Sequence, residues 1–170
     1  MTGSATKLFV ALRALGVAGG FVLLWTWLAI AVRRFDARLG LEIPAGWRTV
    51  GWPLAVLGAL LGAACVVTFV TRGEGTPAPF DPPRRFVASG PYRWMRNPMY
   101  LGGAALLAGA GLVVGSCAIL LLAAAFLAFF HLFVVLYEEP ALAARFGSSY
   151  LEYRRTVNRW LPRRRRPPER

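Results

Sequence analysis

Charged residues are absent from long stretches of this 170-residue chain, and these stretches determine its predicted architecture. None occurs from Thr49 to Thr71 or from Asn97 to Tyr137, and the second stretch is long enough for two membrane crossings of about 20 residues each. A third apolar segment covers residues 14–32. The pattern therefore predicts an all-α polytopic membrane protein with about four transmembrane helices, near residues 14–32, 50–70, 99–115 and 117–137.

The connections at both ends of this pattern are informative. The last two spans are joined at Gly115 and Ser116 by a turn too short to fold outside the bilayer, so they are expected to form a tight helical hairpin. The first span carries several large aromatic residues and is followed by Arg33 and Arg34 without a small-residue cleavage site. We therefore predict a permanent helix there and not a cleaved signal peptide.

Composition supports lipid as the solvent of this chain. Hydrophobic residues make up 56% of it, and the mean hydropathy is +0.50. Two cysteines, Cys65 and Cys117, lie inside apolar spans and are expected to be small packing residues. The net charge of +12 could suggest a nucleic-acid partner, but the arginines border the spans, so we expect an integral membrane protein that binds no nucleic acid.

The distribution of arginine predicts the orientation. The loop after the second span and the C-terminal tail are rich in arginine, which predicts that both lie on the cytoplasmic side of a bacterial inner membrane. The N-terminus is then expected on the same side. The run from Arg163 to Arg166 is expected to lie against anionic headgroups. One loop fits this arrangement poorly, because it lies on the opposite side and still holds four arginines: Arg33, Arg34, Arg38 and Arg48.

Four regions follow from these patterns. Residues 1–71 form an N-terminal region of two spans with generic features, and residues 72–85 form a cytoplasmic connector too rich in proline and glycine to be helical. Residues 86–162 contain nearly all the residue arrangements that ordinary membrane helices do not need. Residues 163–170 form a basic tail. Function is therefore sought in residues 86–162.

The third span is preceded by the segment SGPYRWMRNPMYLGG. Pro98 suits the first turn of a helix, and Asn97 before it is a predicted N-cap. This helix start, with Arg93 and Arg96 nearby, suits a carboxylate or another anionic group. A simple interfacial helix cap with an aromatic belt would give the same pattern.

The fourth span ends in two adjacent carboxylates, Glu138 and Glu139, and contains the only histidine, His131. His131 and Glu138 are seven residues apart and so are expected to share one helix face. Ionisable groups within a span are costly and usually mark a cavity or a functional pathway. A hydrogen bond from His131 to a neighbouring helix is the alternative explanation for the histidine.

The tail segment FGSSYLEYRRTVNRWLP follows. Gly147 is expected to end one short helix, and Ser148 or Ser149 can cap the next. Tyr150, Tyr153 and Val157 recur at spacings of three and four residues, which predicts an interfacial amphipathic C-terminal helix.

In this order, the segments GPYRWMRNPMYLG, EEPAL and FGSSYLEYRRTVNRWLP resemble the isoprenylcysteine carboxyl methyltransferase family and its relatives, the phospholipid methyltransferases. The resemblance covers about half the chain. It implies an enzyme that uses S-adenosyl-L-methionine (SAM), bound without a glycine-rich Rossmann turn, and no such turn occurs here. The cofactor-binding residues that it implies are Arg96, Asn97, Pro98, Tyr100, Gly102, Glu138 and Glu139.

Departures from the family pattern bear on the substrate. The stretch before the acidic pair reads VVLY and lacks the arginine that holds a substrate carboxylate in the prenylcysteine enzymes, so Arg154 or Arg155 is a candidate substitute. The acceptor is then expected to be a lipid, an isoprenoid or another apolar small molecule. His131 is a candidate catalytic base for an amine or hydroxyl acceptor, whereas a carboxylate acceptor needs none. No metal ligand set is predicted.

Two other functions stay open from the sequence. Sterol reductases have a similar C-terminal arrangement, which would make the protein an NADPH-dependent membrane reductase. A non-enzymatic membrane subunit is the third possibility. The adjacent acidic pair and the short chain favour the methyltransferase.

Overall fold

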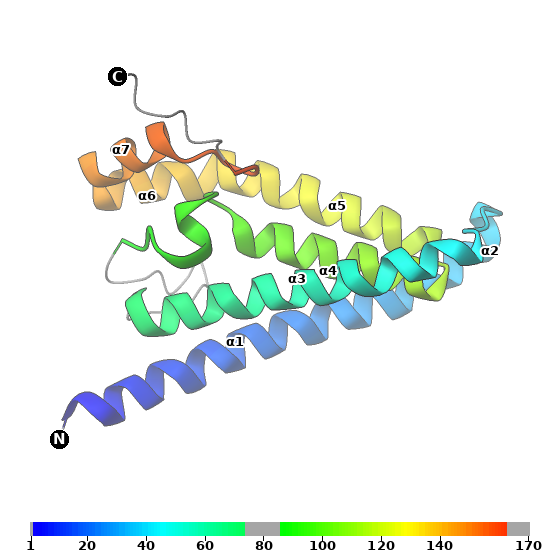
Figure 1. Ribbon diagram of the computed structural model, residues 1–170, viewed down its shortest axis with the longest axis horizontal. Helices are drawn as coiled ribbons and strands as arrows, with labels where there is room; N and C mark the ends of the chain where they lie inside the picture. The colour runs from blue at the N-terminus through cyan, green and yellow to red at the C-terminus, as the bar shows by residue number, and fades with distance from the viewer. Residues whose placement is uncertain (1, 74–85, 163–170) are drawn as a thin grey trace.

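The computed structural model of the protein describes residues 2–73 and 86–162. All regular secondary structure in this part of the chain is helical, and it contains no strand (Figure 1). The four main helices are α1 (Thr2–Val32), α3 (Arg48–Thr68), α4 (Pro98–Val114) and α5 (Cys117–Phe133). Three apolar segments, Ala11–Leu39, Ala45–Arg72 and Cys117–Phe146, are long enough to cross a membrane, and α4 is a shorter apolar helix of 17 residues. The predicted all-α architecture is confirmed.

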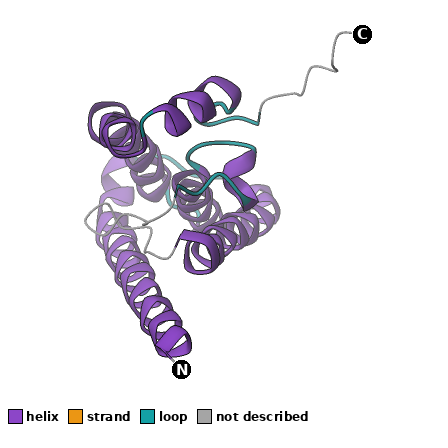
Figure 2. Cartoon of the chain, turned by 90° about the vertical axis from the view of Figure 1, so that its left-hand side faces the viewer, coloured by secondary structure: helices purple, strands orange, loops and turns teal. Residues whose placement is uncertain are grey.

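The helices run back and forth along one long axis (Figure 1). The start of α1, the start of α4 and the two short C-terminal helices, α6 (Glu139–Phe146) and α7 (Ser148–Thr156), lie at one end, which we call the site end. The short helix α2 (Asp36–Leu39) and the turn between α4 and α5 lie at the opposite end. Viewed from the site end, α1 diverges from the other helices towards its N-terminus (Figure 2).

Helices α3 and α4 pack closely because glycines line their contact. Gly51 and Gly58 of α3 face Gly102 and Gly109 of α4, and each pair is seven residues apart on one helix face. A Cβ atom at Gly58 would lie 2.5 Å from the backbone nitrogen of Leu106. Small residues at such contacts let two membrane helices approach closely. The N-terminal region, which the sequence presents as generic, is therefore the support on which α4 rests.

The predicted hairpin between the last two spans is confirmed. Gly115 ends α4 in the left-handed conformation, with φ at 68°, and the Ser116 hydroxyl accepts a 3.2 Å hydrogen bond from the backbone nitrogen of Ile119. Glycine adopts this conformation without steric cost. Asp36 also contributes, because its Oδ1 accepts a 2.8 Å bond from the backbone nitrogen of Ala118. This bond attaches α2 to the first turn of α5.

Two helices widen into π-helical turns at the site end. α3 continues through Phe69–Gly73, and α5 continues through Val134–Glu138 into α6. The prediction that the non-helical connector begins at Arg72 is therefore wrong by two residues, because the helix of the second span extends through Gly73. The rest of the connector, residues 74–85, and the basic tail, residues 163–170, lie outside the described residues.

Gly147 separates α6 from α7, as predicted, with φ at 52°. The prediction that Val157 belongs to the last helix is wrong, since α7 ends at Thr156 and Val157 is extended. The chain then turns back towards the start of α4. This reversal brings residues 158–160 beside the site residues described next.

An aromatic cluster packs between α1, α4 and α5, next to the site end. The Tyr100 ring stacks on Phe130 with centroids 4.3 Å apart, and Trp25 meets Phe126 edge-on at 4.6 Å. Phe126 and Phe130 are buried. Stacked and edge-on pairs of this kind stabilise a core beyond the area they bury. The cluster fixes the ring of Tyr100 within the site.

Candidate functional site

The segment before α4 is held by backbone bonds to the C-terminal tail. A 3₁₀ turn, Gly90–Arg93, leads into it. The Arg96 nitrogen donates to the Asn158 carbonyl at 2.9 Å, and the Asn97 nitrogen donates to the Arg159 carbonyl at 3.2 Å. Asn97 occupies the predicted N-cap position, but its side chain makes no cap bond. Its Nδ2 instead donates to the same Arg159 carbonyl at 3.2 Å. The amide thus joins α4 to the tail.

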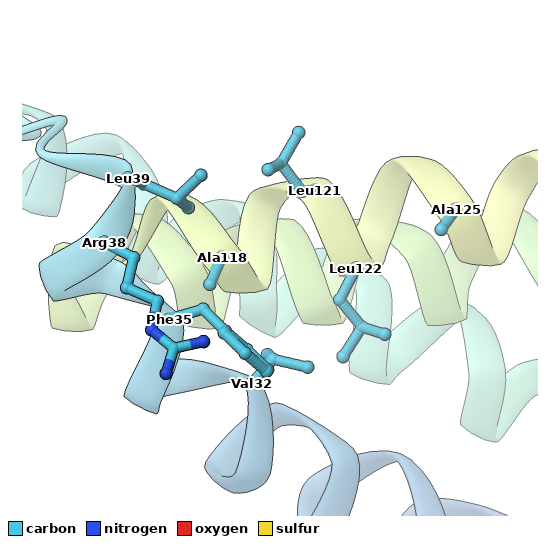
Figure 3. A pocket seen from close by; sticks show the side chains of 8 residues that line it. All are labelled: Val32, Phe35, Arg38, Leu39, Ala118, Leu121, Leu122 and Ala125. Carbon is cyan, nitrogen blue, oxygen red and sulfur yellow. The ribbon is translucent and has the colours of Figure 1, made fainter.

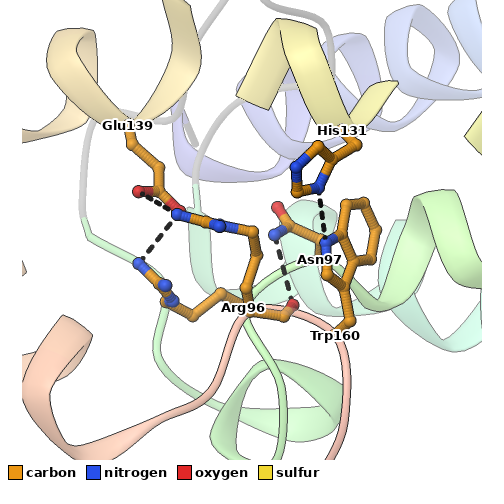
Figure 4. A network of polar contacts seen from close by, with 6 residues as sticks. Arg96, Asn97, His131, Glu139 and Trp160 are labelled. Atoms are coloured by element: carbon orange, nitrogen blue, oxygen red, sulfur yellow. Dashed lines mark hydrogen bonds and ion pairs between the residues drawn. The ribbon is translucent and has the colours of Figure 1, made fainter. Parts of the chain in front are cut away.

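Glu139 is the centre of a buried ion-pair network (Figure 4). Its Oε1 accepts from Arg159 Nε at 2.7 Å, and its Oε2 accepts from Arg159 Nη2 at 3.1 Å. Arg96 Nη1 lies 3.0 Å from Glu139 Oε1. A two-pronged arginine–carboxylate contact is strong and directional, and the bond to Glu139 raises the pKa of Arg159. One carboxylate therefore joins α6, the start of α4 and the tail.

Arg96 keeps donors that nothing in the described part of the chain satisfies. Its side chain is only 10% exposed, and its Nε and Nη1 atoms are buried without a hydrogen-bond partner there. The 3.0 Å approach to Glu139 is an ion pair whose geometry does not make a hydrogen bond. Buried polar groups are nearly always paired, so an unpaired guanidinium N–H calls for an explanation. A bound anionic group would supply one.

Glu138, the neighbour of Glu139, contacts a different helix. Its Oε2 accepts a 2.9 Å hydrogen bond from the Tyr100 hydroxyl on the first turn of α4. The π-helical turn Val134–Glu138 ends between the two carboxylates. Such turns are rare and often occur at functional sites. The adjacent acids consequently contact two different parts of the protein.

Helix α7 is anchored to the segment before α4 by tyrosines. The Tyr153 hydroxyl donates to the Tyr92 carbonyl, and the Phe86 ring lies 5.0 Å from the Tyr153 ring and 6.0 Å from the Tyr150 ring. Tyr150 is only 2% exposed. Burial raises the pKa of Tyr150 and of Tyr153, which keeps both phenols neutral. The predicted interfacial helix thus presents its tyrosine face to the protein.

His131 contacts the tail and not Glu138. Its Nδ1 lies 3.1 Å from Nε1 of Trp160, and the histidine is exposed (Figure 4). The indole nitrogen can only donate, so Nδ1 must accept. A neutral imidazole in this contact carries its proton on Nε2 and offers a donor there.

The structure brings most of the predicted residues to the site end. Arg96, Asn97 and Tyr100 gather there with Glu138 and Glu139. Pro98 is buried as the first residue of α4. Gly102 faces α3, where its Cβ would lie 2.9 Å from the Gly58 carbonyl. Arg154 and Arg155 lie exposed on α7.

Two residues of the site, Arg159 and Trp160, were not among the predicted ones. Both belong to the quoted tail segment, but they follow the end of α7. A helical periodicity could therefore not predict which helix face they would occupy. The only signal was their place directly before Leu161 and Pro162, within a segment that resembles the family. Their contacts depend on the chain reversal after Thr156.

These features define an integral membrane protein with an ionisable site at one end of its helices, an arrangement that membrane proteins keep for binding or catalysis. A family model described as phospholipid methyltransferase matches residues 47–149, and the chain belongs to that family. The matched region contains α3, α4, α5 and both glutamates, whereas Arg159 and Trp160 lie beyond it. No curated protein matched the chain. Membership confirms the resemblance and indicates a membrane methyltransferase.

Proposed function

We propose that the protein transfers the methyl group of S-adenosyl-L-methionine to a lipid-like acceptor within the membrane. The observation that carries this proposal is Arg96, whose buried Nε and Nη1 lack a hydrogen-bond partner in the described residues and lie beside Glu139. The cofactor has a carboxylate, an ammonium group and ribose hydroxyls within one molecule. A site with unused cationic donors next to two carboxylates suits that combination of groups.

The site residues either bind the cofactor or position α4 in this proposal. The free donors of Arg96 bind the cofactor carboxylate. Glu138 and Glu139 bind the ammonium group and the ribose hydroxyls. Tyr100 presents its ring, already stacked on Phe130, to the adenine or to the sulfonium cation. Asn97, Pro98 and Gly102 set the position of α4, through the tail, the first turn and the contact with α3 respectively.

When bound, the cofactor supplies an electrophilic methyl group on a positively charged sulfur. The protein must then align the acceptor with this methyl group and exclude water. The apolar surface of the helices lets a lipid acceptor approach sideways from the bilayer. A carboxylate acceptor needs no base, whereas an amine or hydroxyl acceptor must lose a proton.

His131, Arg154 and Arg155 are the residues we assign to the acceptor. His131 is exposed beside Trp160, and its Nε2 offers a donor to an acceptor oxygen in the tautomer set by that contact. A role as base would require the imidazole to give up its contact with Trp160 or to change tautomer. Arg154 and Arg155 are exposed on α7, where they can attract an anionic headgroup.

Cofactor titration tests the proposal against a reductase. The protein in lipid nanodiscs is titrated separately with S-adenosyl-L-methionine and with NADPH, and binding is measured by calorimetry. We expect binding of the first only. Glu138→Gln and Arg96→Gln should weaken that binding, while Glu152→Gln, which removes an exposed carboxylate on α7, should leave it unchanged. Binding of NADPH, or of neither molecule, would contradict the proposal.

Acceptor identification completes the test. Membranes from cells with and without the protein are incubated with S-adenosyl-L-methionine that carries an isotope-labelled methyl group. Mass spectrometry of the extracted lipids should then find a labelled lipid only where the active protein is present. A non-enzymatic subunit would give no labelled product.

A further inference from the structure

An apolar groove lies at the end of the molecule opposite the site (Figure 3). Its volume is about 440 Å³, and it runs between the end of α1, helix α2 and the first turns of α5. Its lining is aliphatic or aromatic except for one arginine: Val32, Phe35, Arg38, Leu39, Ala118, Leu121, Leu122 and Ala125. Leu121, Leu122 and Ala125 follow α5 away from α2 (Figure 3).

The groove has a fixed end. Asp36 accepts the 2.8 Å bond from the Ala118 nitrogen, and Cys117 Sγ lies 3.5 Å from the Leu41 carbonyl. These two contacts hold α2 and the residues after it against the start of α5. Asp36 is the carboxylate nearest in sequence to Arg34 and Arg38, and its Oδ1 is already hydrogen-bonded to α5.

Two guanidinium groups lie beside the aromatic ring at this end of the groove. The Cζ atom of Arg34 is 5.0 Å from the centroid of the Phe35 ring, and that of Arg38 is 5.6 Å from it. Neither arginine forms an ion pair with a carboxylate in the described part of the chain. The apolar groove therefore ends beside two cations that have no carboxylate partner among the described residues.

We propose that this groove binds an anionic glycerophospholipid, with an acyl chain along Leu121, Leu122 and Ala125 and the phosphate between Arg34 and Arg38. The chain and the headgroup match the apolar lining and the two cations respectively. This site is distinct from the methyl-transfer site and does not rest on the proposed function. It also gives a role to two of the four arginines of the first loop, which the orientation predicted from the sequence places on the side that the positive-inside rule disfavours.

Native mass spectrometry of the full-length protein, released from nanodiscs of mixed phosphatidylglycerol and phosphatidylcholine, tests this proposal. We expect the wild type to retain phosphatidylglycerol preferentially. Arg34→Gln and Arg38→Gln should each reduce that retention about fivefold, the contribution expected of one basic residue near the headgroups. Arg48→Gln removes the same charge from the same loop, at a residue that neither lines the groove nor lies over the Phe35 ring, and it should have no such effect.

A second pair of variants tests the acyl-chain part of the groove. Ala125→Phe fills the groove, whereas Ala124→Phe adds the same ring at an exposed position of α5 that does not line it. We expect only Ala125→Phe to reduce retention, by about fourfold, the effect of displacing one methylene group. Equal retention of both lipids by the wild type, or equal losses in the variants and their controls, would overturn the proposal in favour of ordinary surrounding lipid.

Discussion

The hydroxyl of Tyr100 and the carboxylate of Glu138 meet at 2.9 Å, which joins the first turn of α4 to the π-helical turn at the end of α5. The same tyrosine stacks on Phe130, so its ring and its hydroxyl are held by different contacts. A carboxylate among apolar helices is costly unless donors satisfy it. Tyr100 is therefore a structural partner of Glu138 as well as a proposed cofactor contact.

Tyr100→Phe separates these two roles. The substitution keeps the ring on Phe130 and removes the donor to Glu138. Leaving that acceptor unsatisfied should lower stability by about 1 to 3 kcal/mol, visible as a lower melting temperature in detergent. Tyr137→Phe is the control, because Tyr137 is exposed in the same π-helical turn. Equal stability of both variants would show that the bond contributes nothing.

Glu139 and Arg159 should behave as a coupled pair. Glu139→Gln leaves the Arg96 and Arg159 guanidinium groups without their shared carboxylate, so we expect a loss of about 3 to 5 kcal/mol. Arg159→Gln should cost less, because Arg96 still faces Glu139 and because the Arg159 side chain is 30% exposed. The double variant should lose less than the two single losses together. Thermal unfolding of all four proteins measures the coupling, and additive losses would contradict it.

The glycine contact between α3 and α4 predicts a position-specific effect of one methyl group. Gly58→Ala would place Cβ 2.5 Å from the Leu106 nitrogen, which forces the two backbones apart. Overpacking of this kind costs about 1 to 3 kcal/mol. Gly62→Ala on the same helix meets nothing within 4 Å and serves as the control. Folded yield and melting temperature in detergent should fall for Gly58→Ala alone. Alanine favours a helix more than glycine does, so a matching fall in Gly62→Ala would show that the close backbone contact at Gly58 is not the cause.

The contact between His131 and Trp160 predicts how the histidine acts. If Nε2 is a donor to the acceptor, His131→Gln keeps an N–H group and should retain turnover within about tenfold of the wild type, while His131→Phe should lose more. Loss of a general base would lower turnover by about 100-fold or more in both variants. Turnover of the two variants distinguishes these roles, and cofactor affinity, which should not change in either variant, is the control.

The sequence was sufficient for the helices because lipid imposes a long apolar pattern on any chain that crosses it. The hairpin at Gly115 and the break at Gly147 were equally readable, since a left-handed residue at a helix end favours glycine. Arg159 could not be assigned in the same way. Its partner, Glu139, is 20 residues earlier, and their contact depends on two helix ends and a chain reversal.

The glycine pairs show a different limit. A spacing of seven within α3 or within α4 is visible in the sequence, but the register that sets Gly58 opposite Gly102 is not. The π-helical turns were also unpredictable, because the sequences FVTRG and VVLYE share no pattern and the extra residue in each turn has no side-chain signature. Both features arise from tertiary packing.

The wide turn at Val134–Glu138 has a consequence for how this enzyme family tolerates change in chain length. A π-helical turn holds one residue more than an α-helical turn, so a helix that loses this residue returns to regular α geometry and its downstream residues keep nearly the same direction. Deletion of Val135 would thus leave Glu139 facing Arg159, whereas deletion of one residue from the regular part of α5 would rotate everything after it by about 100°. The wide turn is therefore the place in this membrane segment where the loss of one residue is compatible with the ion pair.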